Sequence, residues 1–135
     1  ILIDMGEAIG LVPQNVGDHL VKRIIGMPGD QVTCCNDEGL ITVNGEAIRE
    51  TYVKPGVAAS NSTFDVVVPD GHVWVLGDNR NRSKDARFHQ QASGFGFVPM
   101  SSIEGRAWLT VYPLDRFGTI PSATHVFENV PDPER

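Results

Sequence analysis

Lysine occurs only three times in this 135-residue chain, and Lys22 lies in an apolar setting, with Val21 before it and Ile24 and Ile25 after it. Most lysines are solvated surface charges, which is the ordinary interpretation of a lysine taken alone. A lysine held on a rigid apolar strand loses hydration, and this loss lowers the pKa of its amine. Because a lysine general base must be neutral, Lys22 is the first candidate for acid–base chemistry.

A second candidate is the polar segment 77–87, with the sequence GDNRNRSKDAR, which follows an apolar stretch ending at Leu76. A salt-bridged surface loop is its ordinary interpretation, and an exposed pair such as Asp85 with Arg87 contributes little stability. The functional interpretation is that Ser83 forms a hydrogen bond that orients a catalytic group, while the ion pairs fix the loop. The residues alone leave both interpretations open.

No other set of residues has the spacing of a catalytic or metal-binding site. The histidines are scattered, without the spacing of metal ligands or the carboxylate partner of a catalytic triad. They are His19, His72, His89 and His125. The segment 94–96 lacks the strand–helix context of a phosphate-binding loop. The sequence therefore predicts no metal and no cofactor.

The elements that must position these residues are β-strands. Apolar stretches rich in β-branched residues alternate with turn residues, and Asn44-Gly45 is the strongest hairpin signal among the turns. The predicted strands are 19–26, 31–35, 40–43, 46–48, 64–68, 72–76 and 105–112. Residues 98–103 predict at most one short helical turn. The sequence thus predicts a mainly β, antiparallel fold with long loops, in which Trp74 packs in the core or on a face.

Composition and charge narrow the class of protein. The chain has 11 Lys+Arg and 17 Asp+Glu, a net charge of −6, which disfavours binding to a phosphate backbone. No apolar run approaches the roughly 18–20 residues of a membrane span. The only cysteines, Cys34 and Cys35, are adjacent, and a bridge between neighbours needs a strained backbone. We interpret them as small residues in a strand, with redox chemistry or an intermolecular bridge as alternatives, and exclude a disulfide-stapled scaffold.

Three segments together resemble the type I signal peptidases. Residues 22–30, KRIIGMPGD, resemble the KRxxGxPGD box of this family, and residues 77–87 resemble its GDNRxxSxDxR box. Residues 105–118 resemble its closing strand. The resemblance implies a partial β-barrel of the signal peptidase type. The implied domains are a loop or lead-in over 1–19, the C-terminal portion of the catalytic domain over 20–118, and an extended tail over 119–135.

The resemblance assigns roles to individual residues. Lys22 matches the general base that activates a serine nucleophile and then protonates the leaving amine. Ser83 matches the hydroxyl that orients this lysine, and Gly77 matches a glycine beside it where any side chain would crowd the amine. Two supporting ion pairs are also implied: Asp78 with Arg23, and Asp85 with Arg87.

The same resemblance implies the partners. Leu20 and Val21 match the strand edge that pairs with an extended substrate, the signal peptide of a secreted preprotein. Family members are anchored in the bacterial plasma membrane, with the catalytic domain on the extracytoplasmic side. Trp108 is interpreted as a core residue, with contact to the membrane surface as the alternative. No nucleic-acid partner is implied.

The chain departs from the family pattern in three respects. Arg82 stands where the family usually has Asn and is expected to face solvent, and Ala86 replaces a Ser and removes its hydroxyl. In the family the catalytic serine precedes the lysine, yet residues 1–21 contain no Ser, Thr or Cys. We therefore interpret the chain as a soluble, inactive fragment without its nucleophile, oxyanion donors or anchor, which would self-associate through uncovered strands.

Two alternatives differ in function from a signal peptidase. One is an autocleaving repressor domain of the SOS-response type, which also uses Ser and Lys but lacks a box like 77–87. The other is a non-catalytic β module that binds extended peptides.

Overall fold

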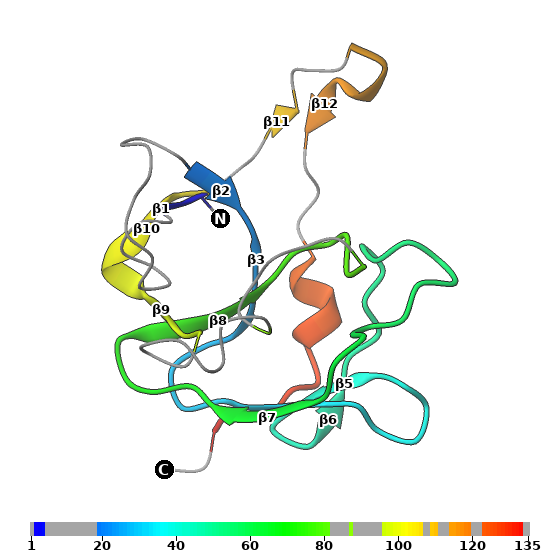
Figure 1. Cartoon of the computed structure of the whole chain (residues 1–135), viewed down its shortest axis with the longest axis vertical. Helices are drawn as coiled ribbons and strands as arrows, with labels where there is room; N and C mark the ends of the chain where they lie inside the picture. The colour runs from blue at the N-terminus through cyan, green and yellow to red at the C-terminus, as the bar shows by residue number, and fades with distance from the viewer. Residues whose placement is uncertain are drawn as a thin grey trace.

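The computed structural model describes residues 2–4, 19–81, 87, 96–106, 109–110, 114–119 and 123–133. Within these residues the chain forms short strands and single turns of 3-10 helix, with no α-helix (Figure 1). The strands are β1 (Leu2–Asp4), β2 (His19–Val21), β3 (Arg23–Gly26), β4 (Gln31–Cys34), β5 (Ile41–Val43), β6 (Glu46–Ala47), β7 (Phe64–Val67), β8 (His72–Leu76), β9 (Val98–Pro99), β10 (Ile103–Gly105), β11 (Leu109–Thr110) and β12 (Gly118–Thr119). The 3-10 turns are η2 (Met100–Ser102), η3 (Leu114–Arg116) and η4 (Thr124–Phe127).

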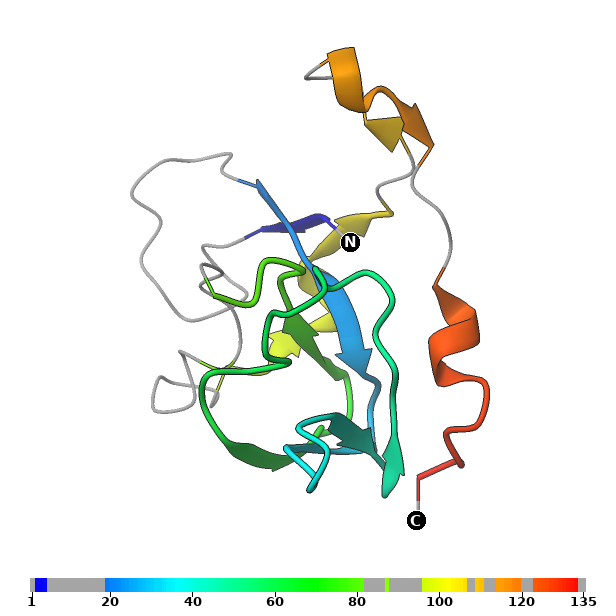
Figure 2. The same ribbon diagram turned by 90° about the vertical axis from the view of Figure 1, so that its right-hand side faces the viewer.

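All strand pairs within the described residues are antiparallel. The sheets have the orders β10-β1-β2, β3-β8-β9, β6-β5-β4-β7 and β11-β12. The chain runs from β2 through β3 into β4 along one curved path and so links three sheets, while the β11–β12 hairpin stands away from them (Figures 1 and 2). The prediction of a mainly β, antiparallel fold is confirmed, and the described sheets do not close into a barrel.

The turn chemistry behaves as the sequence predicts. Asn44 and Gly45 both have positive φ, 52° and 83°, as a tight hairpin between β5 and β6 requires. Gly29 has φ 89°, and the amide of Asp30 donates to the carbonyl of Met27 at 3.0 Å, which closes the Pro-Gly turn between β3 and β4.

The core lies between the sheets and centres on Trp74, which is fully buried. Its ring packs against Phe64 and Phe97, with centroids 5.4 and 5.5 Å away. Among the described residues, thirteen buried apolar side chains form this core, and they lie in the region from β3 to β9. They are Ile25, Val32, Cys34, Ile41, Val43, Ile48, Phe64, Val68, Val73, Trp74, Val75, Leu76 and Val98.

Several predicted elements differ from the structure. The predicted strand 19–26 is divided at Lys22 into β2 and β3, because the two halves join different sheets. Residues 2–4, predicted as lead-in, form β1 between β2 and β10; three residues are too short to show a period, and both partners are distant in sequence. Of the predicted strand 105–112, the described residues place Gly105 at the end of β10 and Leu109–Thr110 in β11.

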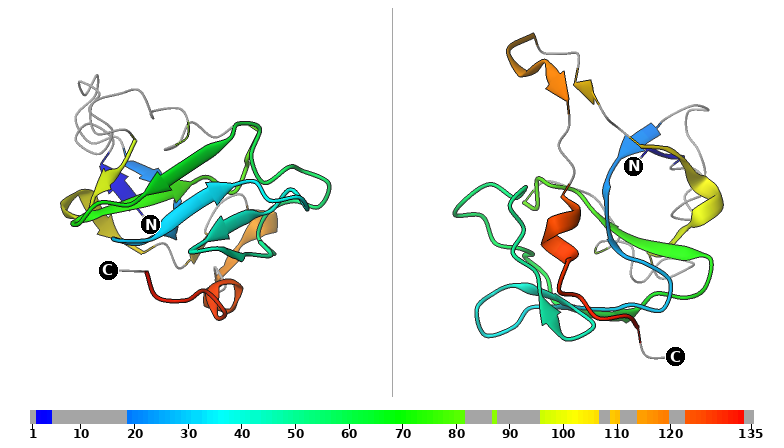
Figure 3. Two further views of the ribbon diagram at one scale, coloured as in Figure 1. Left: turned by 90° about the horizontal axis from the view of Figure 1, so that it is seen from below. Right: turned by 180° about the vertical axis from the view of Figure 1, so that it is seen from behind.

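The segment 119–135, predicted as an extended tail, contains η4. Val126, Phe127 and Val130 pack against the core, and Figure 3 shows residues 123–133 lying along the four-stranded sheet. The segment has too few apolar residues to form a recognisable sequence pattern. These residues are partly buried because they pack on a sheet formed by residues far away in the chain, which is why the sequence did not predict their burial.

Cys34 lies in β4, as interpreted from the sequence, and the structure joins it to Cys35 by a disulfide, which was not among the interpretations. Cys34 is buried in the core and Cys35 is exposed. A bridge between adjacent residues closes no long loop, so the antiparallel sheets still carry the fold.

Candidate active site

Lys22 lies at the point where the chain leaves one sheet for another. It separates β2, which pairs with β1, from β3, which pairs with β8, and it is half-buried. Arg23 is opposite Leu76 in the β3–β8 ladder. One further step in this register places Lys22 opposite Gly77, which is buried. Carried one step beyond the printed ladder, the register is compatible with the neighbouring positions that the resemblance implies for Lys22 and Gly77.

Arg23 and Asp78 form a bidentate ion pair beside that position. Arg23 Nε donates to Asp78 Oδ1 at 2.7 Å, and Nη2 donates to Oδ2 at 2.9 Å. This hydrogen bonding raises the pKa of Arg23 above its ordinary value, against the opposite effect of burial. The ion pair predicted between the two boxes is present, and it fixes the residue after Lys22 to the residue after Gly77.

Arg80 forms a second, buried ion pair that the sequence did not predict. Its side chain pairs with Glu50 through two contacts: Nη1 donates to Oε1 at 2.7 Å, and Nη2 donates to Oε2. Nε also donates to the carbonyl of Gly77, and Nη1 to that of Ala59, both at 2.9 Å. Burial acts to lower the pKa of Arg80, but the bonds to Glu50 outweigh it and raise that pKa.

Tyr52 connects the two ion pairs. Its hydroxyl donates to Glu50 Oε2 at 2.7 Å, while the Cζ atom of Arg23 lies 3.7 Å from the centroid of its ring. Burial, reinforced by the charge of Glu50, raises the pKa of Tyr52, so the phenol stays a neutral donor. We call the five residues Asp78, Arg23, Tyr52, Glu50 and Arg80 the connector network, because Glu50 and Tyr52 belong to the connector between β6 and β7.

Arg87 also forms hydrogen bonds with residues in and near the connector network. It is buried, and its guanidinium donates to the carbonyl of Arg80 at 3.1 Å and to Ser60 Oγ at 3.2 Å. Its predicted partner Asp85 lies outside the described residues, as do Ser83 and the departures from the family pattern at positions 82 and 86.

The predicted substrate-binding residues Leu20 and Val21 lie in β2. Leu20 pairs with Ile3, and Val21 with Leu2. In the described part of the chain β2 is an edge of its sheet, with β1 on one side only. An edge strand has unpaired backbone groups for an extended peptide.

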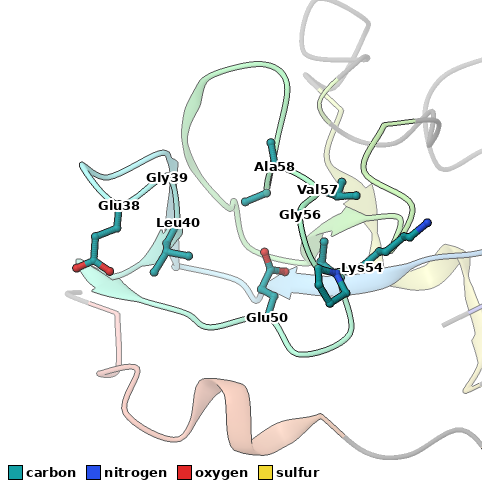
Figure 4. A pocket seen from close by; sticks show the side chains of 11 residues that line it. Glu38, Gly39, Leu40, Glu50, Lys54, Gly56, Val57 and Ala58 are labelled. Atoms are coloured by element: carbon teal, nitrogen blue, oxygen red, sulfur yellow. The ribbon is translucent and has the colours of Figure 1, made fainter.

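A pocket of about 520 Å³ lies elsewhere, between the connector and the turn that follows β4 (Figure 4). Its wall includes Leu40, Glu50, Val53 and Val57, but none of the predicted site residues. Both oxygens of Glu50 are already paired. Among the described residues no group of three or more His, Cys, Asp or Glu could hold a metal ion.

The sequence did not predict Glu50 and Tyr52 because the connector reads as a polar segment without a pattern. One signal was present: Arg80 follows a strand whose last four residues are apolar. A buried arginine needs an acidic partner, and Glu50 is an acid within a connector of the right reach.

Comparison with known proteins identifies the family. Residues 5–112 match the model of the signal peptidase family, peptidase S26. The chain is 36% identical to a probable signal peptidase I of Mycobacterium leprae, with 84% of this chain and 46% of the relative covered. It is 38% identical to signal peptidase I of Mycobacterium tuberculosis, with 84% and 43% covered. It thus spans less than half the length of these relatives.

A solved structure agrees with the sequence matches. The crystal structure of a signal peptidase I from Enterococcus faecalis superposes with a TM-score of 0.55 at 29% identity, covering 77% of this chain and 90% of that one. No helix within the described residues is long and apolar enough to cross a membrane. The match to the family model and these relatives together show that the chain belongs to the signal peptidase family, peptidase S26.

Proposed function

We propose that the protein is a serine endopeptidase that removes signal peptides from exported preproteins, with Lys22 as its general base. The observation that carries this proposal is the position of Lys22 at a junction of two sheets, opposite a buried glycine and next to the Arg23–Asp78 pair. Rigid elements of this kind can hold an amine in one place and limit its hydration.

In the proposed reaction Lys22 Nζ accepts the proton of a serine hydroxyl while the serine oxygen bonds to the scissile carbonyl carbon. The same proton then passes to the leaving amine, which completes acylation, and water hydrolyses the acyl-enzyme. Ser83 would orient the amine through its hydroxyl. No Ser, Thr or Cys precedes Lys22 in this sequence, so we assign the nucleophile to a segment outside it.

The substrate would bind as an added strand along Leu20 and Val21, because β2 is a sheet edge in the described residues. The signal peptide reaches this edge at the extracytoplasmic surface of the plasma membrane, where an upstream segment would anchor the enzyme. Leu114 and Phe117, 80% and 63% exposed in the β11–β12 hairpin, offer apolar contact with that surface. The uncovered β2 edge would favour self-association of this chain alone.

Two alternatives receive less support. The family match favours a signal peptidase over an autocleaving repressor. The edge strand β2 would also suit a non-catalytic module that binds extended peptides, so activity must separate these two functions.

The test is preprotein cleavage by the full-length gene product carrying Lys22→Ala. Loss of a general base lowers kcat by about 10²–10⁴-fold, while circular dichroism and the melting temperature should stay near those of the parent. Lys54→Ala, at an exposed lysine, is the matched control and should cleave normally. Full activity of Lys22→Ala would contradict the assignment of the base, and an inactive parent that binds signal peptides would favour the binding module.

A further inference from the structure

We propose that Glu50 and Tyr52 are positioning residues of the site: through Arg80 and Arg23 they hold the start of the 77–87 segment in register with Lys22. This inference rests on the proposed function, because it assumes that Lys22 is the base. It assigns a catalytic purpose to the connector, which neither of the two family boxes includes.

The first branch of the argument runs through Glu50. Its carboxylate accepts hydrogen bonds from both terminal nitrogens of Arg80 and from the hydroxyl of Tyr52. The side chain of Arg80 is 0% exposed and that of Glu50 is 5% exposed. Arg80 in turn donates to the carbonyl of Gly77. The connector therefore fixes the backbone of the residue that lies opposite Lys22.

The second branch runs through the ring of Tyr52. The guanidinium of Arg23 stacks on that ring and donates two hydrogen bonds to the carboxylate of Asp78. Arg23 follows Lys22 and Asp78 follows Gly77, so the ion pair joins the two chain segments directly beside the base. Tyr52 limits the positions that the guanidinium can take, and it belongs to both branches.

A network of this kind is better suited to fixing the positions of its residues than to stabilising the fold. The desolvation of a buried ion pair offsets much of its attraction, so an apolar pair of similar volume would often stabilise as well. A bidentate pair with every hydrogen bond made specifies one arrangement. The chain also contains an ordinary ion pair nearby, Arg49 with Glu38, whose side chains are 79% and 65% exposed.

A loosened network should impair the base in two ways. A misplacement of about 1 Å at a reacting group can cost about 10²-fold in rate. An amine that moves out of its site also regains water, which raises its pKa. The acidic limb of the pH profile, which reports the fraction of neutral base, then moves to higher pH.

The experiment compares Glu50→Gln, Tyr52→Phe and the control Glu38→Gln in the full-length gene product. Glu38→Gln makes the same chemical change in the exposed pair. We expect Glu50→Gln to lower kcat by about tenfold or more, with KM unchanged and the acidic limb of kcat moved to higher pH. Tyr52→Phe keeps the ring under Arg23 but loses the bond to Glu50, so it should produce a smaller shift in the same direction. Glu38→Gln should match the parent.

A purely structural role would reduce the amount of folded enzyme but leave kcat per folded molecule and the pH profile unchanged. kcat is therefore divided by the fraction of folded protein measured by circular dichroism. If Glu50→Gln does not fold, Tyr52→Phe decides, because it preserves volume: an unmoved acidic limb overturns the inference. Failure of the proposed function has a different signature, since Lys22→Ala would then cleave at the parental rate in the same assay.

Discussion

At the scale of single residues, Tyr52 shows how burial determines the chemistry that a side chain contributes. Its side chain packs against the core, and its hydroxyl donates a hydrogen bond to the carboxylate of Glu50. Burial first, and the negative charge of Glu50 second, raise the pKa of Tyr52. A phenolate at this position would face a carboxylate in a poorly hydrated site, so the folded protein keeps the proton.

This shift predicts how stability depends on pH. The unfolded phenol ionises near pH 10, whereas the folded phenol keeps its proton above that pH. Because the unfolded state then binds fewer protons than the folded state, the contribution of Tyr52 is complete below pH 10 and is lost as the pH rises above it. Urea unfolding between pH 9 and 11 should show a steeper fall in the parent than in Tyr52→Phe. Equal slopes would contradict the burial of the phenol.

At the scale of elements, β3 and β4 come together only because one position has no side chain. A Cβ atom at Gly26 would lie 2.7 Å from Cγ2 of Val32 and 3.0 Å from Cγ2 of Val68. Both valines are fully buried and cannot move into solvent. The glycine of the first box is thus required where the strand after Lys22 packs on the next sheet.

Gly26→Ala should therefore destabilise the protein by about 1–3 kcal/mol, the usual cost of an overpacked core. Gly105→Ala is the matched control, because a Cβ there meets nothing within 4 Å and its φ is not positive. Urea unfolding of both variants measures the difference. A loss at Gly26 no larger than that at Gly105 would mean that β3 and β4 can separate without cost.

These elements also show how far the sequence could predict the structure. Strand β8, the Asn44-Gly45 hairpin and the Pro-Gly turn depend on local signals, and they were predicted. The Arg23–Asp78 pair was predicted from the two boxes. Strand β1 was not predicted, because its pairing depends on distant strands. Glu50 was missed for the same reason: its partner Arg80 is 30 residues away in the chain.

At the scale of the whole molecule, the C-terminal segment 123–133 binds to both the core and the turn after β3. Asn44 Nδ2 donates to the carbonyl of Pro131 at 2.9 Å and to Asp30 Oδ1 at 2.8 Å. The segment therefore reaches the turn that ends the first box, as well as the hairpin at Asn44. Residues 123–133 are thus linked through Asn44 to Asp30, the residue that ends the first box.

Two phenylalanines, one packed against the core and one exposed, test whether the contribution of an apolar residue to stability depends on its burial in this segment. Phe127 is half-buried against the core, whereas Phe117 is 63% exposed in the β11–β12 hairpin. Phe127→Ala should lower the free energy of unfolding by about 1–3 kcal/mol, part of the cost of removing a fully buried ring. Phe117→Ala should change it by less than about 0.5 kcal/mol. Equal effects in chemical denaturation would mean that the C-terminal segment is detached from the sheet in solution, and that β3 and its turn hold their positions without it.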